Sequence, residues 1–174
     1  MAVLIHTERL RLRPMSVRDV DLLLALHAHP EVSRFVGAPN RDETLEWLRG
    51  DERQWADRGY GRLAVFELHG QRFLGRVGLK YWPQFDETEV GWTFRPEAWG
   101  NGYATEASRA CVDWGFRKFD FEYVTAMIER ANVRSAGVAE RLGMTPLRED
   151  VLHDTQVIVH GLDRQTWAAR SSAA

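Results

Sequence analysis

The feature that most constrains the fold is the short passage from a strand pattern to a helix pattern within residues 87–116. Up to Phe94, large apolar side chains alternate with small or polar ones, as in a strand with two different faces. After the turn, apolar residues recur with helical spacing at Ala104, Ala107, Cys111 and Trp114. A second strand pattern at 121–128 completes a strand–helix–strand unit, whose length predicts parallel pairing of its two strands.

Two glycines, Gly100 and Gly102, flank Asn101 at the turn of this unit. Glycine lets the backbone approach a ligand closely, and free N–H groups at the positive end of the following helix favour an anion. The turn therefore predicts a phosphate-binding loop, although the same glycines would also suit a tight turn that binds nothing. A Walker-type loop is excluded because no lysine follows, and a dinucleotide fingerprint fits poorly because Thr105 stands at its third glycine position.

The remaining segments predict a single domain over residues 1–174. Strand patterns are expected at 7–13, in a hairpin of 63–68 and 73–81, and in a final hairpin within 146–162. Helices are expected from Ser16 to near Pro30, from Asn40 with Glu43 in a capping-box pattern, and over 132–142 with a left-handed cap at Gly143. Residues 29–39 are expected to form a loop, and 168–174 a flexible tail.

Composition excludes several classes of function. The chain carries 23 Lys and Arg against 25 Asp and Glu, a formal net charge of −2, so nucleic acid is not the expected partner. The single cysteine, Cys111, falls on the apolar stripe of its helix, and no Cys or His spacing fits a metal, so no metal is expected. The opening MAVLIHTERLRLRP reaches charge too early for a secretory segment, and no run of 18 apolar residues occurs. We therefore expect a cytoplasmic protein without membrane segments.

Three ordered blocks resemble the GNAT superfamily of N-acetyltransferases, and within it the branch of ribosomal-protein N-terminal acetyltransferases. The blocks are TERLRLRPMSVRDVDLLLAL, EVGWTFRPEAWGNGYATEA and NVRSAGVAERLGM. The resemblance implies an α/β (α+β) fold: a mixed, mostly antiparallel sheet of about seven strands with helices on both faces. It also implies acetyl-coenzyme A (acetyl-CoA) as co-substrate, bound where the fourth and fifth strands of the family fold separate.

The family's Gln/Arg-x-x-Gly-x-Gly/Ala loop maps onto residues 99–104, with Trp99 where many relatives carry Gln or Arg. By this resemblance, the residues expected to bind acetyl-CoA are Trp92, Thr93, Phe94, Trp99, Gly100, Asn101, Gly102, Tyr103, Ala104, Thr105, Asn132 and Ser135. Asn132 is also expected to cap the helix that follows it.

Acetyl transfer from a thioester needs a base for the amine and an acid for the departing thiolate. Glu89 is the candidate base, and its alternative role is a structural carboxylate, for example a partner of Arg76. Ser135 is the candidate acid, because Ala139 stands where many relatives carry a tyrosine, and its alternative role is a hydroxyl bonded within its own helix.

The acceptor is expected to be a primary amine, either a protein N-terminus or a small molecule, attacked directly in a ternary complex. Trp82, Phe85 and Asp86, before the strand at 87–94, are expected to receive it, because an aromatic wall and a carboxylate suit a cation. A monomer or a homodimer is expected. The alternative is a module of the same fold that binds acyl-CoA without turnover.

Overall fold

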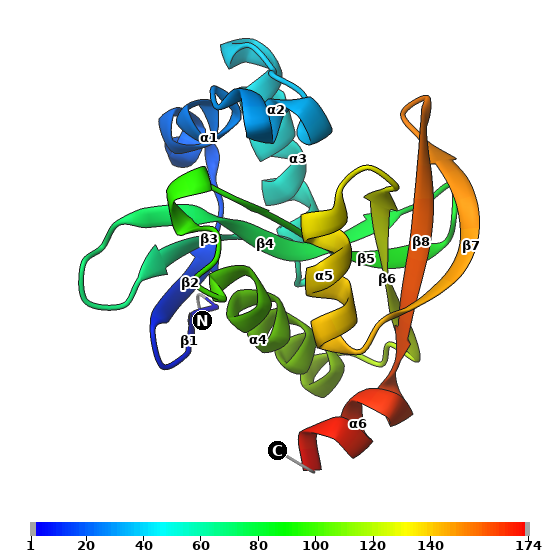
Figure 1. Cartoon of the computed structure of the whole chain (residues 1–174). Coiled ribbons are helices and arrows are strands. Elements are labelled where there is room, and N and C mark those ends of the chain that lie inside the picture. The colour runs from blue at the N-terminus through cyan, green and yellow to red at the C-terminus, as the bar shows by residue number, and fades with distance from the viewer. Residues whose placement is uncertain (1–2, 173–174) are drawn as a thin grey trace.

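The computed structural model describes residues 3–172, and these form one mixed sheet of eight strands in the order β1-β2-β3-β4-β5-β6-β8-β7 (Figure 1). The strands are β1 (Ile5–His6), β2 (Leu10–Pro14), β3 (Arg62–Glu67), β4 (Phe73–Trp82), β5 (Glu87–Phe94), β6 (Tyr123–Glu129), β7 (Thr145–Leu152) and β8 (Thr155–Asp163). Neighbours pair antiparallel except β5 and β6, which are parallel. The fold is that implied by the resemblance.

Helices cover both faces of the sheet (Figure 1). They are α1 (Val20–His27), α2 (Pro30–Val36), α3 (Arg41–Arg58), α4 (Tyr103–Lys118), α5 (Val133–Leu142) and α6 (Arg164–Ser172), with short 3-10 turns η1 (Val17–Asp19) and η2 (Pro96–Ala98). Because successive side chains of a strand point to opposite faces of the sheet, the sheet separates two hydrophobic cores. Leu63 and Val65 of β3 face α4 and α5, whereas Ala64 and Phe66 face α1 to α3.

The parallel junction between β5 and β6 is short. Among the described residues, backbone pairing joins the two strands only at Glu89 and Thr125. By contrast, β4 pairs with β5 along its length, from Gly75 opposite Phe94 to Trp82 opposite Glu87. The sheet therefore opens beyond Glu89, and this opening positions the site described below.

Most elements lie where the sequence predicts them, with three corrections. The described residues form eight strands rather than about seven, because β1 precedes the strand predicted at 7–13. The chain turns between β1 and β2 at Thr7, whose hydroxyl accepts a hydrogen bond from the N–H of Leu10. Residues 30–36 form α2 rather than a loop, with Pro30 suiting its first turn and Gly37 ending it at φ 76°. This helix buries only Val32, so its sequence shows no helical period.

The third correction concerns the C-terminal segment. α6 continues to Ser172, through most of the segment expected to be a flexible tail, and residues 173–174 lie outside the described part. Trp167 explains the difference, because it is 5% exposed and packs against Phe116. Burying one large aromatic side chain stabilises a short terminal helix.

Candidate active site

The turn that leads into α4 is left-handed at two glycines. Gly100 and Gly102 both have φ of 76°, a conformation that residues with a Cβ resist. A Cβ at Gly100 would meet no atom within 4 Å, so backbone conformation rather than crowding requires glycine there. Gly102 is also the N-cap of α4 and has no side chain to cap it, which leaves the N–H groups of the first turn open to a ligand.

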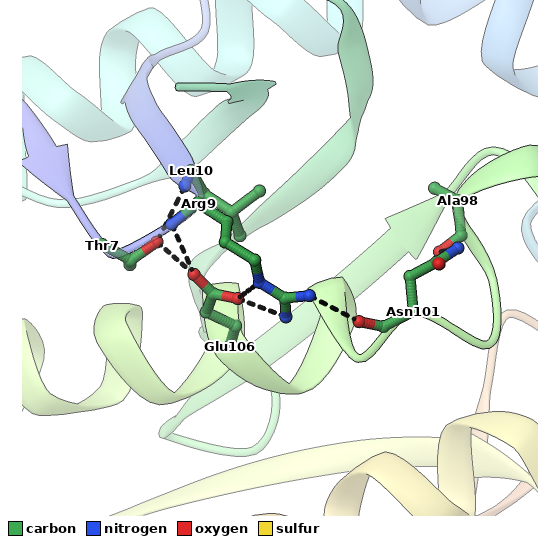
Figure 2. Close-up of polar contacts among 6 residues, drawn as sticks. All are labelled: Thr7, Arg9, Leu10, Ala98, Asn101 and Glu106. Carbon is green, nitrogen blue, oxygen red and sulfur yellow. Dashed lines mark hydrogen bonds and ion pairs between the residues drawn. The ribbon is translucent and has the colours of Figure 1, made fainter. Parts of the chain in front are cut away.

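Glu106 of α4 ties this loop to the N-terminal hairpin (Figure 2). Its carboxylate accepts hydrogen bonds from Thr7 Oγ1 (2.5 Å) and from the backbone N–H (3.1 Å) and Nε (2.7 Å) of Arg9. Arg9 also donates through Nη1 to the carbonyl oxygen of Asn101 (3.0 Å), and its guanidinium lies 4.7 Å from the centroid of the Tyr103 ring. Burial would raise the pKa of Glu106, but the hydrogen bonds from Thr7 and Arg9 outweigh it and lower that pKa.

Trp99 braces the loop from its other end. Its Nε1 donates to the carbonyl oxygen of Phe94 (2.9 Å), the last residue of β5. The guanidinium of Arg134 lies 4.3 Å from the centroid of its ring. The tryptophan therefore fixes the start of the loop to the end of the preceding strand.

A cavity of about 570 Å³, here called the loop cavity, lies over the glycines between α2, α4 and α5. Every residue predicted to bind acetyl-CoA lines it except Asn101, whose side chain instead donates to the Trp99 carbonyl oxygen (3.0 Å). Two arginines that the sequence did not single out, Arg134 and Arg141, also line it, and Arg141 Nε donates to Thr105 Oγ1 (3.1 Å).

A second cavity of about 780 Å³, here called the sheet cavity, lies over β4 and β5 on the face that carries α1 to α3. Its walls are α2, Trp47 of α3, β6 and the turn between β7 and β8. Both cavities are lined by Phe35, Val36, Trp92, Thr93, Asn132 and Ser135. They therefore adjoin at the opening between β5 and β6.

Glu89 lies on the sheet cavity at this opening. Its Oε2 accepts a hydrogen bond from Trp82 Nε1 (2.6 Å), and its Oε1 accepts one from the backbone N–H of Met127 (3.3 Å). Burial raises the pKa of Glu89 and outweighs these hydrogen bonds and the nearby charges of Lys80 and Arg76, which lower it. A carboxylate oxygen accepts more than one hydrogen bond, so a fixed Glu89 can still accept a proton from a bound molecule.

Ser135 lies in the first turn of α5 and lines both cavities. Its backbone N–H donates to Asn132 Oδ1 (3.2 Å), so Asn132 caps the helix as predicted. Within residues 3–172 the Ser135 hydroxyl has no hydrogen-bond partner, so it is not bonded back into its own helix. Ala139 is fully buried, one turn further along α5.

The floor of the sheet cavity carries three cationic side chains on one face of β3 and β4. Arg62 lies 3.1 Å from Asp51 of α3 and is paired with it. Arg76 has no hydrogen bond or ion pair among the described residues, and its Nε is buried. Burial lowers the pKa of Arg76 to about 9 and that of Lys80 to about 8. Lys80 Nζ lies 3.6 Å from the centroid of the Trp82 ring.

The residues predicted to receive the amine separate in the structure. Trp82 is buried, lines the sheet cavity and holds Glu89. Phe85 and Asp86 lie in the turn before β5 and line neither cavity. Asp86 accepts a hydrogen bond from the Tyr81 hydroxyl (2.7 Å) instead.

Cys111 is fully buried in the core, and burial raises the pKa of its thiol to about 12. Such a thiol is a poor nucleophile at neutral pH. No group of three or more His, Cys, Asp or Glu side chains suited to a metal ion occurs in residues 3–172. Within the same range, no helix has the length and apolar character needed to cross a membrane.

Several site residues escaped sequence reasoning. Thr7 and Arg9 lie nearly a hundred residues before Glu106 in the sequence, and no local pattern connects the two segments. Arg76 was named only as a possible partner of Glu89, and Lys80 was not named, although the two share one face of a strand that is otherwise apolar. The sheet cavity that they line could not be predicted, because its walls come from segments that only the fold brings together.

The family model of the acetyltransferase (GNAT) domain matches residues 9–145. The protein YkkB of Bacillus subtilis (strain 168) is 37% identical over 147 residues, which cover 79% of this chain and 83% of YkkB. More distant bacterial relatives are named N-acetyltransferases. The crystal structure of an acetyltransferase from Agrobacterium tumefaciens str. C58 superimposes with a TM-score of 0.85 at 29% identity, covering 94% of this chain and 96% of that one.

A structure of RimL, a ribosomal L7/L12 alpha-N-protein acetyltransferase in complex with coenzyme A, superimposes with a TM-score of 0.79. The identity is 17%, with coverage of 94% of this chain and 99% of that one. At this identity the similarity shows the shared fold and does not single out the ribosomal branch.

Proposed function

The chain belongs to the GNAT family of acetyltransferases, and from this premise we propose that it transfers the acetyl group of acetyl-CoA to a primary amine by direct attack in a ternary complex. The observation that carries the proposal is the meeting of two cavities at Asn132 and Ser135. A thioester reaching this point from the loop cavity faces an amine in the sheet cavity. Such an arrangement holds both reactants in one geometry, which lowers the entropic cost of their encounter.

The loop cavity suits coenzyme A. The uncapped N–H groups of α4 and the positive end of its dipole favour a pyrophosphate, and the left-handed glycines let it approach the backbone. Arg134 and Arg141 supply positive charge along α5. The apolar Trp92 and Phe94 extend the same cavity toward the opening between β5 and β6, where the thioester would lie.

Glu89 is the proposed base. An amine is protonated at neutral pH and must lose a proton before it can attack the acetyl carbon. The raised pKa of Glu89 makes its carboxylate a stronger base than an exposed glutamate, and its bonds to Trp82 and Met127 hold it in place. The proton passes to Glu89 directly or through a water molecule.

Ser135 is the proposed acid. As the amine nitrogen bonds to the acetyl carbon, the carbon–sulfur bond breaks and the thiolate must gain a proton. The free hydroxyl of Ser135 can donate a hydrogen bond to that sulfur and pass its proton to the thiolate. The second proton that the amine nitrogen loses after the nitrogen–carbon bond forms then replaces the proton of Ser135. Ala139 lies deep in the core and provides no alternative acid.

The experiment is a thiol-release assay with acetyl-CoA and a panel of primary amines, both peptide N-termini and small molecules. We expect release that depends on the amine and an acetylated product with the mass of one added acetyl group. Binding of acetyl-CoA without amine-dependent release for any member of the panel would contradict the proposed reaction.

A further inference from the structure

The sheet cavity contains more buried positive charge than its own carboxylates neutralise. Its charged lining residues are Arg34, Arg62, Arg76, Lys80, Glu89 and Glu129. Arg62 is paired with Asp51, and Arg34 is exposed at the rim. Arg76 and Lys80 remain on the floor without an ion pair among the described residues, and both are largely withdrawn from solvent.

An unpaired cation in such a place is costly. Removing a charged group from water is unfavourable unless a partner compensates, so buried arginines are normally paired. Burial lowers the pKa of Arg76 to about 9 and that of Lys80 to about 8, yet both values leave the groups charged at neutral pH. Arg76 lines the cavity, its guanidinium has no protein acceptor within hydrogen-bonding distance in the described chain, and its Nε is buried.

The floor beside these cations is open at Gly91 of β5. Arg76 and Lys80 are four positions apart along β4, and Trp82 lies two positions beyond Lys80. Gly78 lies between the two cations, opposite Gly91 of β5. A Cβ at Gly91 would meet no atom within 4 Å. A small molecule can therefore lie on this backbone, with Lys80 opposite Glu89 at one end and Arg76 opposite Thr93, which lines both cavities, at the other.

From this arrangement we propose that the acceptor carries an anionic oxygen group, such as a carboxylate, which binds Arg76 and Lys80 while its amine lies at Glu89. The inference rests on the proposed function and deepens it, because it names the acceptor as an amine with an acidic group. Two sources fit this chemistry: a free amino acid, and a peptide N-terminus with an acidic side chain close to it. A guanidinium binds a carboxylate through paired hydrogen bonds, which fixes orientation as well as charge.

The test compares matched acids and neutral analogues in the thiol-release assay. One arm uses α-amino acids and their carboxamides, and the other uses short peptides with Asp or Asn at the second position. We expect the acid to exceed its neutral analogue in kcat/KM in at least one arm, and that arm identifies the source. A carboxamide also lowers the pKa of the neighbouring amine relative to the acid. The decisive quantity is therefore how the ratio of kcat/KM for the acid to kcat/KM for its neutral analogue changes on mutation.

In Arg76→Gln, that ratio should fall by about 10- to 100-fold, the effect of losing a hydrogen bond between charged groups, while acetyl-CoA affinity stays unchanged. Lys80→Gln should lower it less, because Lys80 already contacts the ring of Trp82, with Nζ 3.6 Å from the centroid. Arg11→Gln is the matched control, because Arg11 of β2 also has a buried Nε with no hydrogen-bond partner among residues 3–172 but lines neither cavity. Its ratio should match the wild type.

Equal use of acids and analogues by the wild type, or a proportional loss of both in Arg76→Gln, would overturn the inference. Loss of acetyl-CoA affinity in that variant would do the same, because the cations would then serve the cofactor. If no amine is acetylated, the proposed function fails, and the inference is decided by calorimetry of amino acids and their carboxamides with the coenzyme A-bound protein. Absence of a preference for the acids would reject it.

Discussion

The loop cavity and the sheet cavity adjoin at the same residues, but they are built by different means. The side of the loop cavity formed by residues 99–105 depends on backbone: two left-handed glycines and the first turn of α4 in one contiguous segment. The sheet cavity depends on side chains, with Glu89, Arg76 and Lys80 drawn from two strands and walls from four other elements. Backbone donors suit a ligand that never changes, whereas side chains can be exchanged singly, so the second cavity is where acceptor choice can vary.

The largest effect should come from Gly102→Val, which distorts the backbone that lines the loop cavity. A β-branched residue resists a φ of 76°, so the loop should shift and its N–H groups should lose the ligand. We expect acetyl-CoA affinity, measured by calorimetry, to fall on the order of 10²- to 10⁴-fold, as for two lost charge-assisted hydrogen bonds. Gly59→Val is the control, since Gly59 has φ of 74° at the end of α3, away from both cavities. Unchanged affinity in a folded Gly102→Val protein would show that the loop does not bind the cofactor.

Replacing a single side chain of the sheet cavity should lower the reaction rate without changing the affinity for acetyl-CoA. Glu89→Gln should lower kcat roughly 10²-fold or more if Glu89 is the base. Since its pKa is raised and only the deprotonated form accepts a proton, wild-type activity should fall as pH drops through a value above the usual carboxylate range of about 4.3, and the variant should lack this limb.

Glu87→Gln is the matched control for this change. Glu87 is a buried carboxylate two residues away, held by Arg148 (2.9 Å and 3.0 Å), and it lines neither cavity. The Glu87→Gln variant should be less stable than the wild type but should keep its pH profile of activity. A parallel profile in Glu89→Gln would make Glu89 structural.

Ser135 belongs to both cavities, so its variant tests the boundary between them. Ser135→Ala should lower kcat by about 10- to 100-fold with little change in acetyl-CoA affinity, because the hydrogen bond strengthens only as charge develops on sulfur. Single-turnover kinetics would measure this step. Ser108→Ala, which removes a buried hydroxyl of α4 that lacks a partner, should leave kcat unchanged. A wild-type rate in Ser135→Ala with chemistry rate-limiting would exclude Ser135 as the acid.

The smallest effect should come from the support of the glycine loop. Glu106→Gln weakens the ion pair with Arg9, whose side chain is 45% exposed, so we expect acetyl-CoA affinity to fall by about 2- to 5-fold. Glu67→Gln is the control, because it weakens the similar pair with Arg72 at the far hairpin. Equal affinity in both variants would show that the loop holds its shape without this ion pair.

The same contrast explains how much the sequence could predict. The strand, glycine loop and helix are consecutive, so local rules located β5, the two glycines of the turn and the start of α4. The residues resembling a cofactor site, except Asn101, then line one cavity. The acceptor side was predicted as Trp82, Phe85 and Asp86. Trp82 lines the sheet cavity, whereas Phe85 and Asp86 lie close to β5 in sequence but outside the cavities. Arg76 lies there because of strand register, and register follows from the whole sheet rather than from any segment.

The family match spans residues 9–145, and the network around Glu106 shows what such boundaries would remove. A recombinant piece trimmed at those residues would keep the glycine motif but lose Thr7, one of its anchors. It would also lose β8, which pairs with β6 along the whole of that strand. For anyone choosing expression limits, the stretch that identifies this chain is shorter than the stretch that holds its site together.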